Sequence, residues 1–507
     1  MKDLGGRSIT AVFWGGGGAI LRIVLQLITQ IALARILGPA QYGLFAIGAI
    51  VISFSNFFSD IGIAYGLIQK TEVTDYDLRF VFTWQIIIGS IVTFIVAYYS
   101  NSIALFLGDV NAGGVVLFLA IVCLLNALAA PSNNMLKRSL NFKSIQIAQL
   151  SGYVGGYIFV GLPLALAGMK VWALVAAWVV QASITLAMLY ASAQHPLRLL
   201  FWHADSQSIS KYGGVVLITN ITNWLIGNID RVIIARFFSS KEVGLYATSY
   251  NVLQNPTSAL LGVIQPVFFS ASSRLSDDRS KVSNAYYALI GAIALFIFPV
   301  FSSVAAVSET FMSAVYGVQW LSAASVFRPL ALAMPLFLIW GMTTPLLWTG
   351  GTPIREFKAQ FPIAILWVAV SWVAAHYSTA MVGWSVCAMF ALRCFVVIYI
   401  ARKTLNLSWR HLWEVTRGGL FIAMICVMTI VTLDLLLIYF NIAYAFIRII
   451  VEGFLMVILY VTMLLKMPYL IPDELAMVIS RVAESCSPNI ARHLGKIIKM
   501  SPSYVDR

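Results

Sequence analysis

The chain has 507 residues, of which 60% are hydrophobic and only 10% are charged. Because a soluble globular protein carries roughly a quarter charged residues, this composition excludes an ordinary soluble enzyme. The formal net charge of +13 lies mainly in loops between apolar segments, so it does not indicate a nucleic-acid partner.

The apolar residues form runs of about 20 separated by short polar breaks, a pattern typical of a polytopic helical membrane protein. Backbone groups inside a bilayer have no water to bond, so these runs are expected to be helices, and the alternation of an outer-membrane barrel is absent. We predict an all-α membrane protein with about 14 transmembrane helices. They are placed near residues 9–34, 43–68, 80–106, 113–132, 145–167, 171–193, 212–237, 246–270, 285–307, 323–348, 360–376, 380–400, 418–440 and 444–465.

Lysine and arginine residues gather in alternate loops, which hold about 24 of the 33, against about four in the other loops. The positive-inside rule then places both termini in the cytoplasm, and we expect a bacterial inner (cytoplasmic) membrane. The first apolar segment is long and lacks a small-residue cleavage site, so no cleavable signal peptide is expected. The five cysteines fall in spans or on the cytoplasmic side, which predicts no disulfide framework.

The first predicted span contains four consecutive glycines, at 15–18, followed by Arg22. A cation at membrane depth costs at least about 2.5 kcal/mol, so Arg22 is expected to face water and a ligand and not lipid. Gln26 and Gln30 follow it at i+4 and i+8 and extend one polar stripe along an otherwise apolar helix. The glycines are typical of close packing or of a bend.

An internal repeat relates residues 28–46 to residues 229–247 without gaps, at an offset of 201. The copies fall at the first and seventh spans, and a displacement of six helices keeps the orientation. We therefore expect two parallel six-helix lobes with a shared site between them near mid-membrane. The predicted divisions are an N-lobe (1–197), a C-lobe (198–403), two additional helices (404–466) and a cytoplasmic amphipathic tail on the inner leaflet (467–507).

Polar residues on several spans are expected to converge on a central hydrated cavity. The candidates for substrate binding are Arg22, Gln26, Gln30, Asn56, Asn220, Asn223, Asp230, Arg231 and Arg328. Asp60 and Asp434 are candidates for carrying a coupling proton or sodium ion.

Packing explanations stand beside these functional ones. The adjacent Asp230 and Arg231 are equally consistent with holding their span to a neighbouring helix. Arg393 lies near the end of its span and is expected to extend its charged group to the interface. Arg448 and Glu452, at i and i+4, are expected to pair with each other.

Enzyme and cofactor motifs are not found in the sequence. The glycine run lies inside a span with no preceding strand, and there is no phosphate-binding GxxxxGK[ST] motif. The five histidines are scattered, without metal-ligand spacing. We therefore expect a transporter, with no cofactor and no metal, and not an enzyme.

Five segments of the sequence carry a family resemblance: LARILGPAQYGLFAIGAIVISFSNFFSDIGIAYGLIQK (33–70), PSNNMLKRSLNFKSIQIAQ (131–149), IDRVIIARFFSSKEVGLYATSYNVLQNP (229–256), IQPVFFSASSRL (264–275) and VYGVQWLSAA (315–324). They resemble the polysaccharide-transport flippases of bacteria, the Wzx-like branch of the multidrug/oligosaccharidyl-lipid/polysaccharide exporter superfamily. The resemblance covers roughly the first 330 residues. The acid that usually ends the first family motif is missing from the loop Gly38-Pro39-Ala40-Gln41.

The resemblance implies two six-helix lobes plus two helices around a cationic cavity. It implies movement of an undecaprenyl-diphosphate-linked oligosaccharide from the cytoplasmic to the periplasmic leaflet, for exopolysaccharide, capsule or O-antigen synthesis. Membrane lipids, and polymerase and chain-length proteins of the same pathway, would be partners, and a monomer suffices. Arg22 would then bind the diphosphate or an acidic sugar, because its fork matches phosphate oxygens.

Two alternatives remain open. A cation-coupled multidrug antiporter of the same superfamily would share the fold but is expected to have a predominantly acidic cavity. Here intramembrane arginines outnumber intramembrane acids, which favours an anionic guest. A membrane polysaccharide polymerase is less favoured, because no outward loop is large enough for its site.

Overall fold

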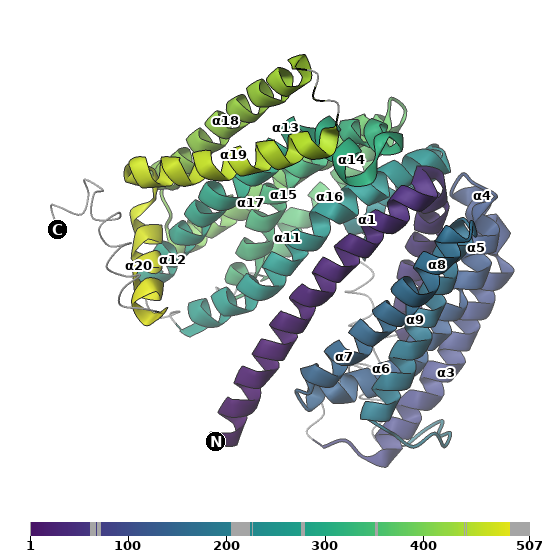
Figure 1. Cartoon of the computed structure of the whole chain (residues 1–507). Helices are drawn as coiled ribbons and strands as arrows, with labels where there is room; N and C mark the ends of the chain where they lie inside the picture. Colours follow the sequence, from purple (N-terminus) through teal and green to yellow (C-terminus); the bar gives the residue numbers. More distant parts are fainter. Residues whose placement is uncertain are drawn as a thin grey trace. The chain divides into compact units, whose positions relative to one another are not determined.

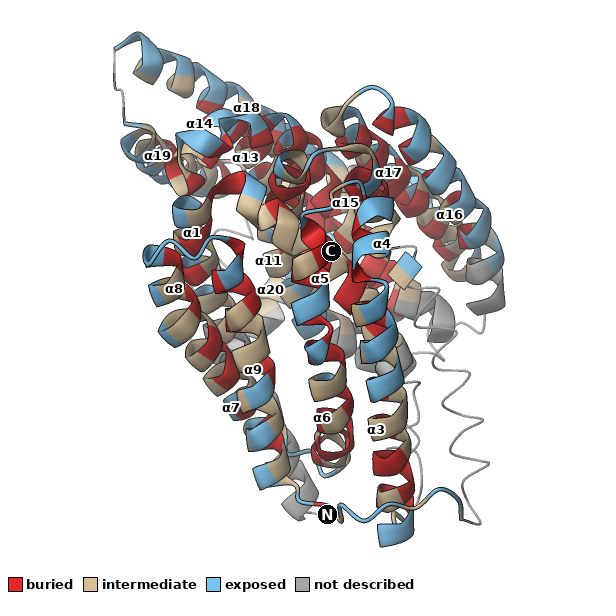
Figure 2. Ribbon diagram, turned by 90° about the vertical axis from the view of Figure 1, so that its right-hand side faces the viewer, coloured by how far each residue is buried: buried red, intermediate tan, exposed pale blue. Residues whose placement is uncertain are grey.

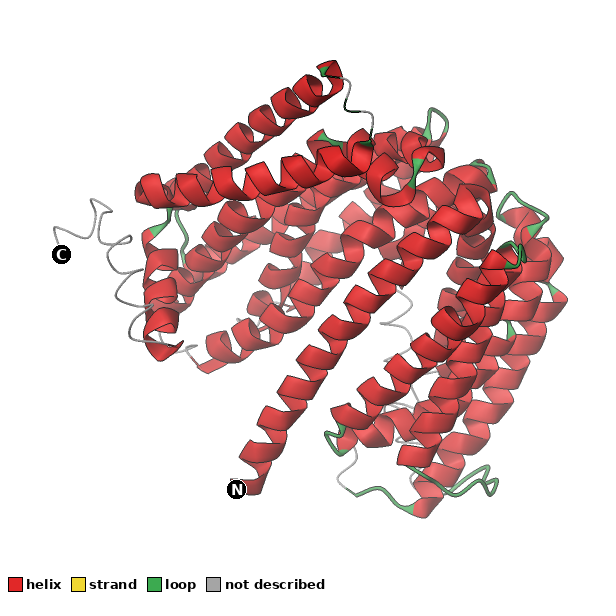
Figure 3. Cartoon of the chain, in the orientation of Figure 1, coloured by secondary structure: helices red, strands yellow, loops and turns green. Residues whose placement is uncertain are grey.

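The computed structural model describes residues 2–60, 67, 72–203, 224–225, 227–274, 279–349, 353–440, 442 and 444–486. Within these ranges every regular element is a helix and no strand occurs (Figure 3). Asn220 and Asn223 lie outside the described residues, and the side chain of Asp60 is likewise not described.

The chain divides into two compact units, residues 1–248 and 249–507. Figure 1 labels the helices of both units. Unit 1 contains α1 (Lys2–Asp60), α3 (Asp75–Tyr98), α4 (Ser100–Phe106), α5 (Ala112–Leu119), α6 (Ile121–Arg138), α7 (Phe142–Tyr153), a π-helical stretch (Val154–Gly161), α8 (Leu162–Leu166) and α9 (Val171–Ser192). The chain passes from unit 1 into unit 2 within α11 (Ser240–Arg274). Unit 2 then contains α12 (Arg279–Ala292), a π-helical stretch (Ile293–Ile297), α13 (Phe298–Ala306), α14 (Ser308–Tyr316), a 3₁₀ helix (Val318–Ala323), α15 (Ala324–Thr349), α16 (Pro353–Ala375), α17 (Thr379–Leu405), α18 (Trp409–Tyr439), α19 (Ala445–Lys466), a 3₁₀ turn (Pro468–Leu470) and α20 (Asp473–Cys486).

Among the described residues, ten helical segments are long and apolar enough to cross a membrane. This confirms the prediction of an all-α, multi-pass membrane protein. The total of about 14 spans and the division into two lobes plus two helices stay predictions. One predicted span, near 212–237, falls largely outside the described residues.

The first two predicted spans form one element, α1, broken by a sharp corner. Gly38 has φ 75° and ψ 172°, a conformation open to glycine, and Pro39 follows it. The corner is held in place by Gln41, whose Oε1 accepts a hydrogen bond of 3.1 Å from the backbone N–H of Val171. This bond satisfies an otherwise unpaired donor at the start of α9.

The two copies of the repeated motif touch each other within unit 1. A Cβ atom on Gly43 would overlap the carbonyl oxygen of Ser240, and one on Gly244 would overlap that of Pro39. At an offset of 201, Ser240 is the counterpart of Pro39 and Gly244 that of Gly43, so the contact is reciprocal. Reciprocal contact between equivalent positions is what a local two-fold relation produces. The glycines allow two backbones to approach without intervening side chains.

The helices differ in how they are covered. In the apolar spans formed by α18 and α19, only 22% and 11% of the residues are buried. In the span that includes most of α15, 67% of the residues are buried (Figure 2). In a membrane protein, apolar side chains left exposed by the protein contact lipid. We infer that α15 is an inner helix of unit 2 and that α18 and α19 present a broad face to the bilayer.

The segment that follows α9 lies along the start of α3. Arg79 donates two hydrogen bonds, both 3.2 Å, to the backbone carbonyls of residues 198 and 199. Trp84 donates to the carbonyl of Phe201 at 3.1 Å. Asp77, which is fully buried, lies 3.4 Å from Nε2 of His203. This segment is therefore attached to unit 1 by side-chain contacts.

His195 lies in the same segment and is buried against Phe82 and Tyr190, with ring centroids 4.9 and 5.3 Å away. Burial holds the pKa of this imidazole below its usual value of about 6.5. The ring is therefore neutral at pH 7 and contributes to packing.

Candidate functional site

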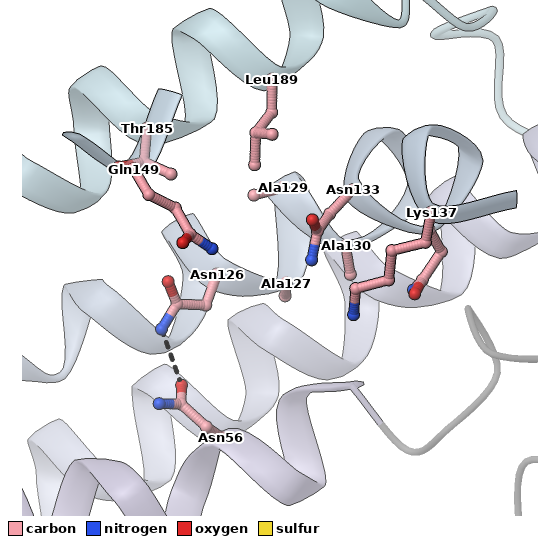
Figure 4. A pocket seen from close by; sticks show the side chains of 11 residues that line it. Asn56, Asn126, Ala127, Ala129, Ala130, Asn133, Lys137, Gln149, Thr185 and Leu189 are labelled. Carbon is pink, nitrogen blue, oxygen red and sulfur yellow. Dashed lines mark hydrogen bonds between the residues drawn. The ribbon is translucent and has the colours of Figure 1, made fainter. Parts of the chain in front are cut away.

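A polar pocket of about 290 Å³ lies within unit 1, between α1, α6, α7 and α9 (Figure 4). Its polar lining consists largely of amide side chains, together with one lysine. The lining residues are Asn56, Asn126, Ala127, Ala129, Ala130, Asn133, Asn134, Lys137, Gln149, Thr185 and Leu189.

Helix α6 supplies most of this lining because its polar residues share one face. Asn126, Asn133 and Lys137 stand at i, i+7 and i+11, so their side chains follow each other along the helix. Pro131 lies within α6 and has no N–H to donate to the carbonyl of Ala127, four residues earlier. The Ala127 carbonyl therefore lacks its usual helical donor at the pocket wall.

Two asparagine oxygens at the pocket lack partners. The Oδ1 atoms of Asn133 and Asn134 are both buried and accept no hydrogen bond, and the Asn134 residue is only 2% exposed. By contrast, Asn126 Nδ2 donates to Asn56 Oδ1 at 3.2 Å (Figure 4). An unsatisfied buried acceptor costs about 1–3 kcal/mol. A ligand rich in hydroxyl or amide donors would recover that free energy.

Arg22 contacts the pocket wall through Gln149. Its Nη1 donates to Gln149 Oε1, and its Nε is buried without a partner. Because the Gln149 oxygen is occupied by the guanidinium, the amide nitrogen is left as the donor for the pocket. Arg22 thus brings positive charge to the wall and orients a lining amide without itself lining the pocket.

The other predicted residues of the first span do not line this pocket. The backbone carbonyls of Gln26 and Gln30 accept hydrogen bonds from Tyr153 (3.5 Å) and Tyr42 (3.1 Å), and both glutamine residues are half-buried. Their contacts belong to helix packing.

Asp230 and Arg231 have structural contacts of their own. Tyr246 of α11 donates a hydrogen bond to Oδ2 of Asp230, which is buried. Arg231 Nη1 donates to Asn228 Oδ1 at 3.2 Å. The Tyr246 contact agrees with the packing explanation for Asp230, because it joins the helical segment 227–237, which carries Asp230, to α11.

Arg328 and Asp434 belong to unit 2. Arg328 Nε donates to the carbonyl of Ala305 at 3.4 Å, and its Nη2 lies 4.0 Å from Glu309 Oε1. Asp434 Oδ1 accepts from Thr310 and from an arginine of α19. Of the predicted site residues, the structure thus brings Asn56 into the pocket and Arg22 to its wall.

Two expectations about intramembrane arginines are wrong. Arg448 pairs with Asp434 across the α18–α19 turn, at 3.3 Å, and not with Glu452. Arg448 and Asp434 both lie near the end at which α18 connects to α19. The guanidinium therefore reaches the carboxylate of the neighbouring helix. Arg393 does not extend to the interface: it is 7% exposed, donates to Gln360 Oε1 at 2.9 Å, and lies over an aromatic ring.

The pocket is also lined by residues that are not among the predicted site residues: Asn126, Asn133, Asn134, Lys137 and Gln149. A usable signal was present, because amide side chains within apolar spans are uncommon and tend to face the protein interior. Lys137 is one of the basic residues that the positive-inside rule counts in the cytoplasmic loops, which gives it no binding role from the sequence.

A second pocket of unit 1 has a different character. It measures about 560 Å³ and is lined almost entirely by apolar side chains of α1, α3 and α4, together with Trp224, Leu225, Ile229 and Val232. Such a lining offers dispersion contacts and no charge, which suits hydrocarbon.

The fold defines a class, that of polytopic helical membrane proteins. The structure is similar to that of the lipid II flippase MurJ in an inward closed conformation, with a TM-score of 0.70 over 89% of this chain and 98% of that one. The sequences are 10% identical, so this likeness concerns the fold.

Residues 32–325, more than half of the chain, match the family described as polysaccharide biosynthesis protein, and the chain belongs to this family. The chain is 24% identical to the lipopolysaccharide biosynthesis protein WzxC of Escherichia coli (strain K12), over 64% of this chain and 66% of that protein. It is 23% identical to the succinoglycan biosynthesis transport protein ExoT of Rhizobium meliloti (strain 1021), over 70% of each. The alignments thus span about two thirds of these relatives.

Proposed function

We propose that this protein translocates an undecaprenyl-diphosphate-linked oligosaccharide from the cytoplasmic to the periplasmic leaflet of the bacterial inner membrane. Membership of the polysaccharide biosynthesis family supports a glycan substrate. The fold of a lipid II flippase and a relative named as a transport protein support translocation. Alternating access, with both termini in the cytoplasm, is part of the proposal.

The observation that carries this proposal is the chemistry of the polar pocket. The buried, unpartnered oxygens of Asn133 and Asn134 are acceptors without a donor, and sugar hydroxyls can donate to them. Lys137 in the lining and Arg22 behind Gln149 supply positive charge for a diphosphate or an acidic sugar. The described lining contains no Asp or Glu. A neutral-to-cationic polar surface of this kind suits an anionic glycan.

The remaining predicted residues keep their proposed roles in other states of the transport cycle. We propose that Asn56 binds sugar hydroxyls with the α6 amides. A cavity between the lobes would also be lined by Gln26, Gln30, Asn220, Asn223, Asp230, Arg231 and Arg328. Asp60 stays a candidate for ion coupling. The lobes 1–197 and 198–403, the additional helices 404–466 and the tail 467–507 complete the proposed monomer, with polymerase and chain-length proteins as pathway partners.

The second candidate function is a cation-coupled multidrug antiporter, which would place acidic groups toward a cationic guest. The absence of a carboxylate from the described pocket lining disfavours it. A polymerase remains the enzyme alternative, and the following experiment separates all three.

The test is the leaflet on which lipid-linked repeat units accumulate when the gene is deleted. A membrane-impermeant lectin or glycosidase added to spheroplasts reports outward-facing units. We expect complete units to be trapped on the cytoplasmic side. Unpolymerised units accumulating outside would identify a polymerase, and no accumulation in a strain with this single flippase gene would favour the drug exporter.

Complementation then tests the pocket. Arg22→Ala and Asn133→Ala are each expected to lower polymer output at least tenfold at normal expression, because each removes a group that presents charge or hydrogen bonds to the substrate. Asn111→Ala, at an exposed residue in the turn before α5, is the matched control and should restore full output. Wild-type output from both pocket variants would contradict the assignment of the pocket.

A further inference from the structure

A cluster of charged side chains lies within unit 2, where α18, α19 and α14 meet. Asp434 Oδ1 accepts hydrogen bonds from Thr310 Oγ1 at 2.9 Å and from Arg448 Nη1 at 3.3 Å. The side chains of Arg448 and Asp434 are only 15% and 18% exposed. This part of the molecule is separate from the polar pocket of unit 1.

Glu452, one turn further along α19, is fully buried. Neither of its carboxyl oxygens receives a hydrogen bond. Glu452 stands at i+4 from Arg448, on the helix face from which that guanidinium reaches Asp434. Two ionised carboxylates both accept hydrogen bonds and neither donates one. A hydrogen bond between the carboxyl groups of Glu452 and Asp434 can form only when one of them carries a proton.

The charges of the cluster lead to the same conclusion. Arg448 offers one positive charge against two carboxyl groups, and its Nη1 is directed to Asp434. The charged residue of α14, Glu309, has a 71% exposed side chain and lies near Arg328. The titratable residue of the 3₁₀ turn that packs on α19, Tyr469, is also exposed, so its side chain is not part of the buried cluster. With both carboxyls ionised, the buried cluster would carry a net negative charge, which costs far more free energy than a neutral acid.

We propose that Asp434 and Glu452 together bind one exchangeable proton, with Glu452 holding it while Asp434 pairs with Arg448. When the proton leaves, Glu452 becomes a carboxylate that competes with Asp434 for the same guanidinium, which changes the contacts between α18 and α19. A sodium ion is disfavoured at this position because the guanidinium already occupies Asp434 Oδ1 and repels a second cation. Intramembrane acids of this kind are the usual carriers in proton-coupled transport.

The test is infrared difference spectroscopy of the purified full-length protein in lipid nanodiscs. We expect a protonated-carboxyl C=O band at neutral pH that shifts in D₂O. Glu452→Gln and Asp434→Asn should each abolish the band, because the remaining acid then pairs alone with Arg448. Glu72→Gln, at an exposed acid outside the cluster, should leave the band unchanged. Thermal unfolding of the same samples verifies that the variants are folded.

A wild-type spectrum without the band, or a band that persists in both cluster variants, would overturn the proposal. Loss of the band on adding sodium chloride in place of potassium chloride would overturn it in favour of a sodium site. The link to transport rests on the proposed function, whereas proton binding does not. An intact band together with a negative leaflet assay would therefore refute the flippase and leave the proton site standing.

Discussion

At the scale of single residues, Arg393 illustrates how a charge is accommodated away from water. Its guanidinium carbon lies 4.0 Å from the ring centroid of Trp340 and 5.7 Å from that of Trp367, while Nε donates to Gln360. Aromatic faces and an amide oxygen thus replace the hydration that the charge loses. A desolvated cation–π contact of this type contributes about 2 kcal/mol.

We predict that Arg393→Ala destabilises unit 2 by about 3 kcal/mol, because it removes the stacking and leaves a buried Gln360 oxygen unpaired. Arg393→Lys should cost about 1–2 kcal/mol, since an ammonium keeps the charge but cannot stack as a planar fork. Arg236→Ala is the control, because Arg236 is exposed and lies 5.6 Å from the Phe106 ring. The measurement is the thermal unfolding midpoint in detergent. Equal midpoints for wild type and Arg393→Ala would contradict the prediction.

At this scale the sequence pattern identified which residues are polar inside spans but not which ones meet. Arg22 and Asn56 could be selected because an arginine or asparagine in an apolar helix requires a partner. Their partners, Gln149 and Asn126, lie on other helices, and a periodicity within one helix carries no information about its neighbour. Only the packing of the helices decides those pairs.

At the scale of elements, the corner of α1 depends on close backbone approach. Gly43 N lies 2.9 Å from a Cβ atom placed on Gly244, and Gly244 N lies equally close to one placed on Gly43. No side chain could move to relieve such an overlap, because the neighbouring atoms belong to the backbone. The two helices must therefore separate if either glycine gains a methyl group.

We predict that Gly43→Ala and Gly244→Ala each destabilise unit 1 by about 1–3 kcal/mol, the usual cost of overpacking. Gly262→Ala in α11 provides the matched control, since nothing lies within 4 Å of its added methyl group. Alanine there should stabilise the helix by up to about 1 kcal/mol through higher helix propensity. Thermal unfolding of the three variants measures this order, and a stabilised Gly43→Ala protein would rule out the tight corner.

The predicted spans and the observed helices differ most where the candidate pocket lies. Hydropathy ends the fourth span near residue 132, yet α6 continues to Arg138. Hydropathy reports compatibility with lipid, whereas a helix ends where its backbone hydrogen bonds end. The last turns of α6 are polar because they face the pocket, so Asn133, Asn134 and Lys137 fell outside the predicted span.

At the scale of the whole molecule, the distribution of basic residues predicts the direction of transport. The turn between α6 and α7 lies among Lys137, Arg138 and Lys143, whereas the turn between α8 and α9 carries Lys170 alone. The positive-inside rule places the first turn in the cytoplasm and the second outside. The polar pocket lies beside the last turns of α6, so the rule also predicts that it is reached from the cytoplasmic side, where lipid-linked sugars would enter.

We predict that Met169→Cys is labelled by a membrane-impermeant maleimide in intact spheroplasts, whereas Ser139→Cys is labelled only after lysis. Both positions are exposed in turns between helices, so accessibility differs by side of the membrane and not by burial. Cys123, Cys394 and Cys426 are buried and should give little background in a parent that carries Cys387→Ser and Cys486→Ser. Labelling of Ser139→Cys from outside would invert the topology. Since the α6 pocket would then face the periplasm, that result would also reverse the proposed direction of lipid-linked oligosaccharide movement.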